Sequence, residues 1–165
     1  MLLYESRLLA REDFSNDKVD AGDVGSGRSV TALYDIVPVG GPRLNPDLRY
    51  GTVPADASSG VAGEYAHVGI RYELPEAEAS SLMTTPIDRT RENARFEDAP
   101  QEARFATSVA AFGELLKGCP YTGTLRLDDV ARMASAAKGE DPFGYRAEFV
   151  QLVRAAKTAQ GLGSP

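Results

Sequence analysis

The chain has little of what catalytic and metal sites are usually built from. Its 165 residues include one cysteine, Cys119, and one histidine, His67. A single cysteine cannot form a disulfide within the chain, and one residue of each type is too few for a zinc cluster. To act as a nucleophile and its base, the two would have to meet in space, and nothing in their spacing favours this. The sequence therefore predicts no such metal centre and no catalytic residue.

Long apolar runs and basic clusters are also missing. No stretch is long enough to cross a bilayer, and the N-terminus, MLLYESRLLARED, lacks the basic start and unbroken apolar core of a signal peptide. The net charge of −6 repels phosphate backbones, so we expect no nucleic-acid partner. We also expect no direct membrane insertion by this chain. If the protein is exported, its signal lies outside the sequence.

What remains is the composition of a globular domain, with 42% hydrophobic and 25% charged residues. We expect a single domain over residues 1–165. Its predicted parts are a β-rich subregion at 1–88, a connector at 89–99, a helical subregion at 100–160 and a frayed tail at 161–165. Because strands precede helices, the order predicts an α+β fold: an antiparallel sheet or partial β-sandwich, then three helices.

Four segments of the first half are typical of strands. The clearest is 64–74, EYAHVGIRYEL, in which every second residue is apolar. This period of two, with one polar face, predicts a half-buried antiparallel strand with His67 facing solvent. The apolar face would be formed by Ala66, Val68, Ile70, Tyr72 and Leu74. The other predicted strands are 2–9, 29–39 and 80–87, and a long Gly- and Pro-rich loop is expected at 40–63.

Helical periodicity marks the second half. A helix is predicted over 100–117, begun at Pro100 and ended by Gly118, with an apolar face of Phe105, Val109, Phe112 and Leu116. A second, alanine-rich helix is predicted at 128–138, ended by Gly139. Asp141 and Pro142 predict a capped start for a third helix, whose apolar face would comprise Tyr145, Phe149, Leu152, Val153 and Ala156.

The stretch 12–27, EDFSNDKVDAGDVGSG, suggests a calcium loop because it is rich in oxygen ligands. An EF-hand loop beginning at Asp13 needs Gly at its sixth position and Glu at its twelfth. Lys18 and Val24 stand there instead, so the EF-hand interpretation fails. The Gly-Ser-Gly run at 25–27 is interpreted as a turn, because no helix follows it to bind a phosphate.

A looser oxygen-ligand site in the same stretch stays open. Its weak candidate metal ligands are Asp17, Asp20 and Asp23. The alternative is a solvated loop rich in turns. We predict no cofactor.

Several motifs carry a resemblance to a known family. They are DAG-x-x-G-x-G-x-x-VTALY-x-I-VP at 20–38, VGIRY at 68–72 and DPFGYRAEFV at 141–150. These runs resemble the C-terminal region of YfbK-type bacterial proteins, which follows a von Willebrand factor type A (vWA) domain. The matches extend over nearly the whole chain.

The resemblance implies a β-sandwich flanking the vWA domain, with the helices after it, in a protein of the cell envelope or periplasm. The metal site of that family is the DxSxS motif of the vWA domain itself. This chain has no such motif, since Asp56-Ala57-Ser58-Ser59 has the wrong spacing. No metal-binding residue is therefore carried over.

We accordingly expect a non-catalytic accessory domain that braces a vWA domain, in cis or as a separate chain, and binds other envelope proteins. Because the chain begins within its first predicted strand, we expect that it is a fragment or that its sheet closes differently. One alternative is a stand-alone calcium- or ligand-binding module that uses the acidic loop at 13–27 and the loop at 40–63. Another is a peptide receptor that uses the free edge of the strand at 2–9.

Overall fold

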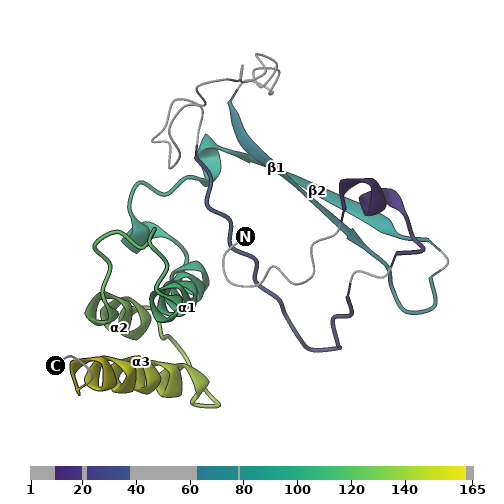
Figure 1. Ribbon diagram of the computed structural model, residues 1–165. Coiled ribbons are helices and arrows are strands. Elements are labelled where there is room, and N and C mark those ends of the chain that lie inside the picture. Colours follow the sequence, from purple (N-terminus) through teal and green to yellow (C-terminus); the bar gives the residue numbers. More distant parts are fainter. Residues whose placement is uncertain (1–9, 20–21, 38–62, 78, 163–165) are drawn as a thin grey trace. The chain divides into compact units, whose positions relative to one another are not determined.

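The computed structural model describes residues 10–19, 22–37, 63–77 and 79–162 (Figure 1). The chain divides into two compact units, which we treat one at a time. The hairpin unit holds the described residues of 10–23 and 63–92, and the helical unit holds 93–162. Of the extended segment 24–37, residues 24–34 belong to the helical unit and residues 35–37 to the hairpin unit. The division after residue 92 falls inside the predicted connector at 89–99.

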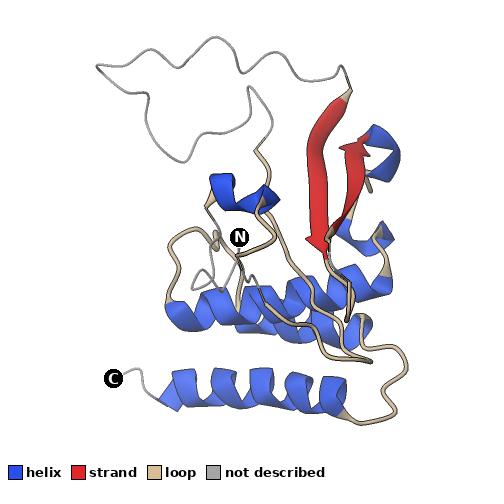
Figure 2. Ribbon diagram, turned by 90° about the vertical axis from the view of Figure 1, so that its right-hand side faces the viewer, coloured by secondary structure: helices blue, strands red, loops and turns tan. Residues whose placement is uncertain are grey.

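The described residues form a two-stranded antiparallel sheet followed by three α-helices, so the predicted α+β class is confirmed (Figure 2). Strand β1 spans Glu64–Tyr72 and β2 spans Ser81–Asp88. These match two of the predicted strands. A β-sandwich is not seen among the described residues, which contain this one sheet.

The predicted strand at 29–39 is wrong for its described part. Residues 29–37 have no regular secondary structure, and Val30 is 78% exposed. The segment has the β-branched and aromatic composition of a strand, but such a propensity is realised only against a neighbouring strand. The predicted strand at 2–9 and most of the predicted loop at 40–63 lie outside the described residues.

Strand β1 pairs with β2 in a register that places Ile70 opposite Met83 and His67 opposite Pro86. A bulge interrupts the pairing between Glu64 and Ala66. Since directly opposite residues share a face, the apolar residues of both strands gather on one side. We call this side the apolar face, and its apolar members are Ala66, Val68, Ile70, Tyr72, Met83 and Ile87.

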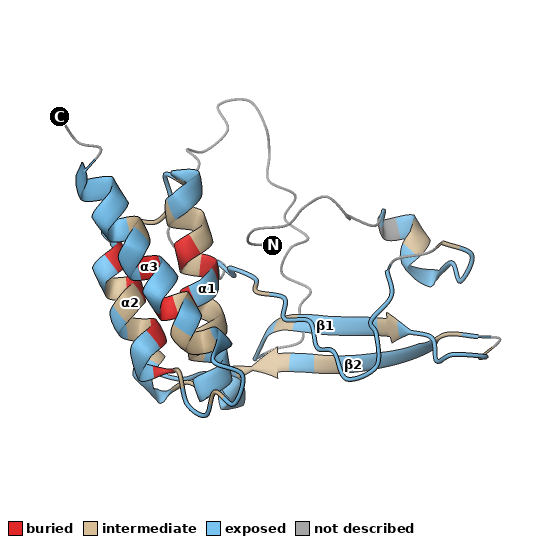
Figure 3. Cartoon of the chain, turned by 90° about the horizontal axis from the view of Figure 1, so that it is seen from below, coloured by how far each residue is buried: buried red, intermediate tan, exposed pale blue. Residues whose placement is uncertain are grey.

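The apolar face is open rather than half-buried, which corrects the sequence prediction. Ile70 is 48% exposed and Met83 is 51% exposed, and no residue of either strand is buried (Figure 3). A two-stranded sheet cannot bury a face without an opposing layer of helix or sheet. The described residues of the hairpin unit contain no second sheet and no α-helix to form such a layer.

The helical unit, in contrast, encloses a core of its own. Helix α1 spans Gln101–Lys117, α2 spans Leu127–Ala136 and α3 spans Tyr145–Leu162. Helix α2 packs against both α1 and α3. The core cluster consists of Phe112, Leu127, Val130 and Val153. The ring of Phe149 meets that of Phe112 edge to face, at 5.6 Å between centroids.

The ends of the helices follow the local signals with two corrections. Helix α2 begins at Leu127 and ends at Ala136, so it stops short of the predicted end at Lys138 before Gly139. Gly118 adopts φ 68° and ends α1 as predicted, a conformation that costs glycine little. The Asp141 carboxylate accepts the N–H groups of Arg146 and Ala147, so it does cap α3. However, α3 begins at Tyr145 and not at Pro142, which lies in the preceding turn.

The buried side of α1 differs from the predicted face. Val109 and Leu116 are exposed, whereas Ser108 is fully buried. The buried residues of α1 are Ser108, Ala110 and Phe112, while Phe105 and Leu115 are partly buried. Two members of the predicted face, Phe105 and Phe112, thus lie on the packed side. Ser108 is tolerated there because its hydroxyl donates to the Arg104 carbonyl at 2.8 Å.

We predict that Phe112→Ala lowers the free energy of unfolding of the helical unit by about 3–5 kcal/mol, because it leaves a cavity in the core. Leu116→Ala, on the same helix but 62% exposed, is the matched control and should cost about 0.5 kcal/mol or less. Urea denaturation followed by circular dichroism measures both. Equal losses in the two variants would contradict the assigned core.

Candidate functional site

The two faces of the hairpin have different neighbours, and this difference defines the candidate site. The 3₁₀ helix η1, Arg11–Ser15, contributes Phe14. A methyl group added at Gly69 would lie 3.5 Å from the Cζ atom of Phe14 and 3.8 Å from a methyl group of Leu82. Gly69 and Leu82 belong to the face opposite the apolar face. The aromatic ring of η1 therefore contacts the side with the polar pattern at Gly69, while Leu82 on that side stays 53% exposed.

A polar cluster, the Asp17 anchor, holds the acidic stretch at the same hairpin. The Ser80 hydroxyl donates to an Asp17 carboxylate oxygen at 2.5 Å. Arg71 Nε lies 2.6 Å from the Ser80 hydroxyl oxygen and 3.3 Å from the same Asp17 oxygen. Thus a strand residue and a residue just before β2 bind one carboxylate of the stretch at 12–27.

The anchor lowers the pKa of Asp17. The largest cause is the hydrogen bond from Ser80, and the charge of Arg71 acts in the same direction. A carboxylate with a lowered pKa is a weak general base, so Asp17 is poorly suited to activate the Ser80 hydroxyl. The cluster joins the segment at 12–27 to the hairpin.

The three weak metal candidates have different surroundings. Asp17 is paired with the Arg71 guanidinium, a positive charge that opposes cation binding beside it. Asp20 lies outside the described residues, and Asp23 is exposed. In the described part of the chain, no three His, Cys, Asp or Glu side chains are grouped to hold a metal ion. The structure does not bring Asp17 and Asp23 into such a group.

His67 and Cys119 belong to different units. His67 lies exposed on β1, on the face that Phe14 contacts. Cys119 directly follows the helix stop at Gly118 and is partly exposed. Each therefore has the local setting that the sequence indicated.

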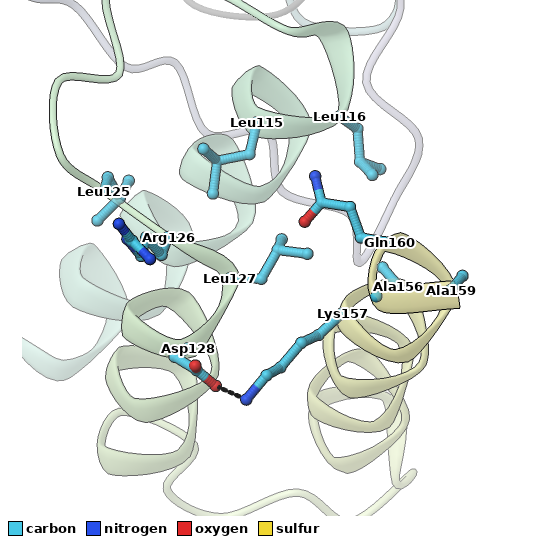
Figure 4. Close-up of a pocket in the computed structure, with 11 residues that line it drawn as sticks. Leu115, Leu116, Leu125, Arg126, Leu127, Asp128, Ala156, Lys157, Ala159 and Gln160 are labelled. Carbon is cyan, nitrogen blue, oxygen red and sulfur yellow. Dashed lines mark hydrogen bonds and ion pairs between the residues drawn. The ribbon is translucent and has the colours of Figure 1, made fainter. Parts of the chain in front are cut away.

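The helical unit carries an open groove of about 750 Å³ at one end of the bundle (Figure 4). Four leucines line it, and an ion pair joins its sides, with Lys157 Nζ of α3 2.5 Å from a carboxylate oxygen of Asp128 on α2. The lining holds no nucleophile next to a base. Its lining residues are Leu115, Leu116, Leu125, Arg126, Leu127, Asp128, Ala156, Lys157, Ala159, Gln160 and Gly161.

Within the described residues, no helix combines the length and the apolar character needed to cross a membrane.

Comparison with known proteins assigns the family. Residues 1–159 match the family model described as the C-terminal region of the uncharacterized protein YfbK. The chain belongs to this family. It is 39% identical over 153 residues to the uncharacterized protein YfbK of Escherichia coli (strain K12), a match that covers 93% of the chain. The chain spans only about a quarter of that relative, 26% of its length. No solved structure matches it.

We predict that Asp17→Asn releases η1 from the hairpin, because the amide cannot replace a charged partner of Arg71. Asp23→Asn, in the same stretch, is the matched control and should leave the contact in place. The nuclear Overhauser contact between the Phe14 ring and Gly69 reports the docking. Its persistence in Asp17→Asn would contradict the anchor.

The contact should also depend on pH. The folded-state pKa of Asp17 is lowered from its ordinary value, so the stabilisation is present above the unfolded pKa of about 3.9. It is lost as the pH falls through the folded value. The Phe14–Gly69 contact should therefore be intact at neutral pH and weaken only below about pH 4.

Proposed function

We propose that this chain is a non-catalytic accessory domain of a longer YfbK-type protein, and that its hairpin packs against a neighbouring domain of the vWA type. The observation that carries the proposal is the exposed apolar face of the hairpin, to which both strands contribute. Family membership and the 26% coverage of the E. coli relative support a larger protein as its context.

Burial of the apolar face by a partner is energetically favourable. Val68, Ile70, Tyr72 and Met83 are each 38–51% exposed and form one continuous side of the sheet. Completing the burial of such side chains contributes on the order of 1 kcal/mol each. A contiguous apolar patch that stays in water marks a contact surface more often than an isolated exposed leucine does.

A second β-layer suits this face best. Sheets of a sandwich pack with their side chains interdigitating about 10 Å apart. In our proposal the hairpin forms part of one layer and the longer protein supplies the other. This is the partial β-sandwich that the family resemblance implies.

The non-catalytic part of the proposal rests on the chemistry of the described residues. Asp17 is a weakened base, and the groove at the end of the helical bundle holds no nucleophile next to a base.

The vWA domain in cis is the first partner that we propose, and other envelope proteins come next. A place in the cell envelope or periplasm follows from the family resemblance. Neither nucleic acid nor direct membrane insertion is part of the proposal, for the reasons of charge and hydropathy given above.

We predict that Met83→Glu weakens binding to the E. coli YfbK relative from which the matched quarter has been removed. A carboxylate would be buried without a partner on the apolar face, so we expect a loss of tenfold or more in the dissociation constant. Leu82→Glu is the matched control: it is the adjacent residue, equally exposed, on the opposite face. It should change the constant by less than about threefold.

Isothermal titration calorimetry measures both variants, with the relative's own C-terminal quarter as the positive control. If that control binds and the unmodified chain does not, the proposed function is wrong. Equal losses in the two variants would show that the apolar face is not the contact.

A further inference from the structure

The two outer edges of the hairpin are not equivalent. Among the described residues the sheet has two strands, so each strand has one edge without a neighbour. β2 carries Pro86 within its length. Proline lacks an N–H and is found in strands where its nitrogen faces away from the neighbouring strand, at the edge of a sheet. Because Pro86 has no N–H to donate to an added strand, the outer edge of β2 is protected against pairing.

The register then indicates what the outer edge of β1 offers. Pro86 lies opposite His67. A proline fits an antiparallel ladder at a pair that exchanges no hydrogen bonds, and in such a pair the N–H and C=O groups of both residues point outward. His67 thus points its backbone groups away from β2, and with the alternation of the ladder so do Gly69 and Arg71.

The outer edge of β1 lacks the usual protection against pairing. Natural sheets blunt an edge with proline, with lysine or with a bulge in the middle of the strand. β1, EYAHVGIRY, contains neither proline nor lysine. Its one irregularity in pairing lies at its beginning, between Glu64 and Ala66. The outward-facing residues His67, Gly69 and Arg71 follow this bulge, with no further irregularity among them.

From these observations we propose that the outer edge of β1 is a strand-addition site. Its occupant is a β-strand from the part of the longer YfbK-type protein that this chain does not span. This inference deepens the proposed function and rests on it. The added strand bonds to the outward groups of His67, Gly69 and Arg71, as in other cases of strand addition.

Two features define the chemistry of the occupant. Its apolar residues alternate, so that one side continues the apolar face beside Val68 and Ile70. Exposed carboxylates lie at both ends of β1, on Glu64 and on Glu73 just after it. Opposite charges across neighbouring strands are favourable, so basic residues at the ends of the added strand fit this edge.

The length of the relative is the reason for placing the occupant in the same longer protein. The matched region is 26% of the E. coli protein, which leaves about three quarters of its length to supply a strand. A second copy of this chain, its segment 29–37 and the strand predicted from the sequence at 2–9 are the other possible occupants. All three are distinguished by the experiment below.

The test compares His67→Pro with His67→Thr. Proline at 67 removes an outward N–H and leaves the bonds to β2 in place, whereas threonine keeps the N–H and replaces the same side chain. With the shortened E. coli YfbK as probe, we expect at least a tenfold weaker dissociation constant for His67→Pro and less than a threefold change for His67→Thr. Equal binding by the two variants would overturn the strand-addition site, while the proposed function would stand if Met83→Glu still weakened binding.

Hydrogen exchange on the unmodified chain gives a test that needs no variant. On addition of the probe, the amides of His67, Gly69 and Arg71 should become protected, while those of α2, used as the reference, should not change. Exchange that stays fast in the complex would overturn the site. Protection already present in the isolated chain would overturn the proposed occupant. It would assign the edge to a segment of the chain itself, such as 2–9 or 29–37, or to a second copy if light scattering shows a dimer. Absence of any binding would instead refute the proposed function.

Discussion

A two-stranded sheet cannot bury an apolar face without a second layer, and this constraint shapes the whole hairpin unit. Among the described residues of this unit, the Phe14 ring and the Asp17 anchor contact one face of the sheet at Gly69 and Arg71. The helical unit does not share the problem, because Phe112, Val130 and Val153 close a core among three helices. The helical unit therefore has a buried core, whereas the hairpin unit has an exposed apolar face.

The acidic stretch at 12–27 gains a structural role from this arrangement. Its first part forms η1, and Asp17 binds Arg71 and Ser80 of the hairpin unit. This stretch resembles a calcium loop in composition. Through Asp17 it is bound to one face of the hairpin. The open face is then the part of the unit left for a partner, which is why we place the site there.

The sequence was most informative where local rules decide the outcome. Gly118 ended α1 as predicted, and the alternation in 64–74 located β1. It failed where a distant partner decides, since segment 29–37 has strand propensity but pairs with no neighbouring strand among the described residues. The burial of Ser108 was missed for a different reason, because its hydroxyl is satisfied locally by the Arg104 carbonyl. The pairing of Asp17 with Arg71 joins residues 54 positions apart, so no local pattern could have revealed it.

Oxidative footprinting of Met83 tests the central claim most directly. The comparison is between the isolated chain and a chimera in which this chain replaces the matched quarter of E. coli YfbK. Met83 is half exposed on the apolar face, and Met133, in the helical unit, serves as the internal reference. Our account predicts rapid oxidation of Met83 in the isolated chain and strong protection in the chimera. Equal oxidation rates in both would show that the longer protein leaves the apolar face uncovered, and would contradict the account.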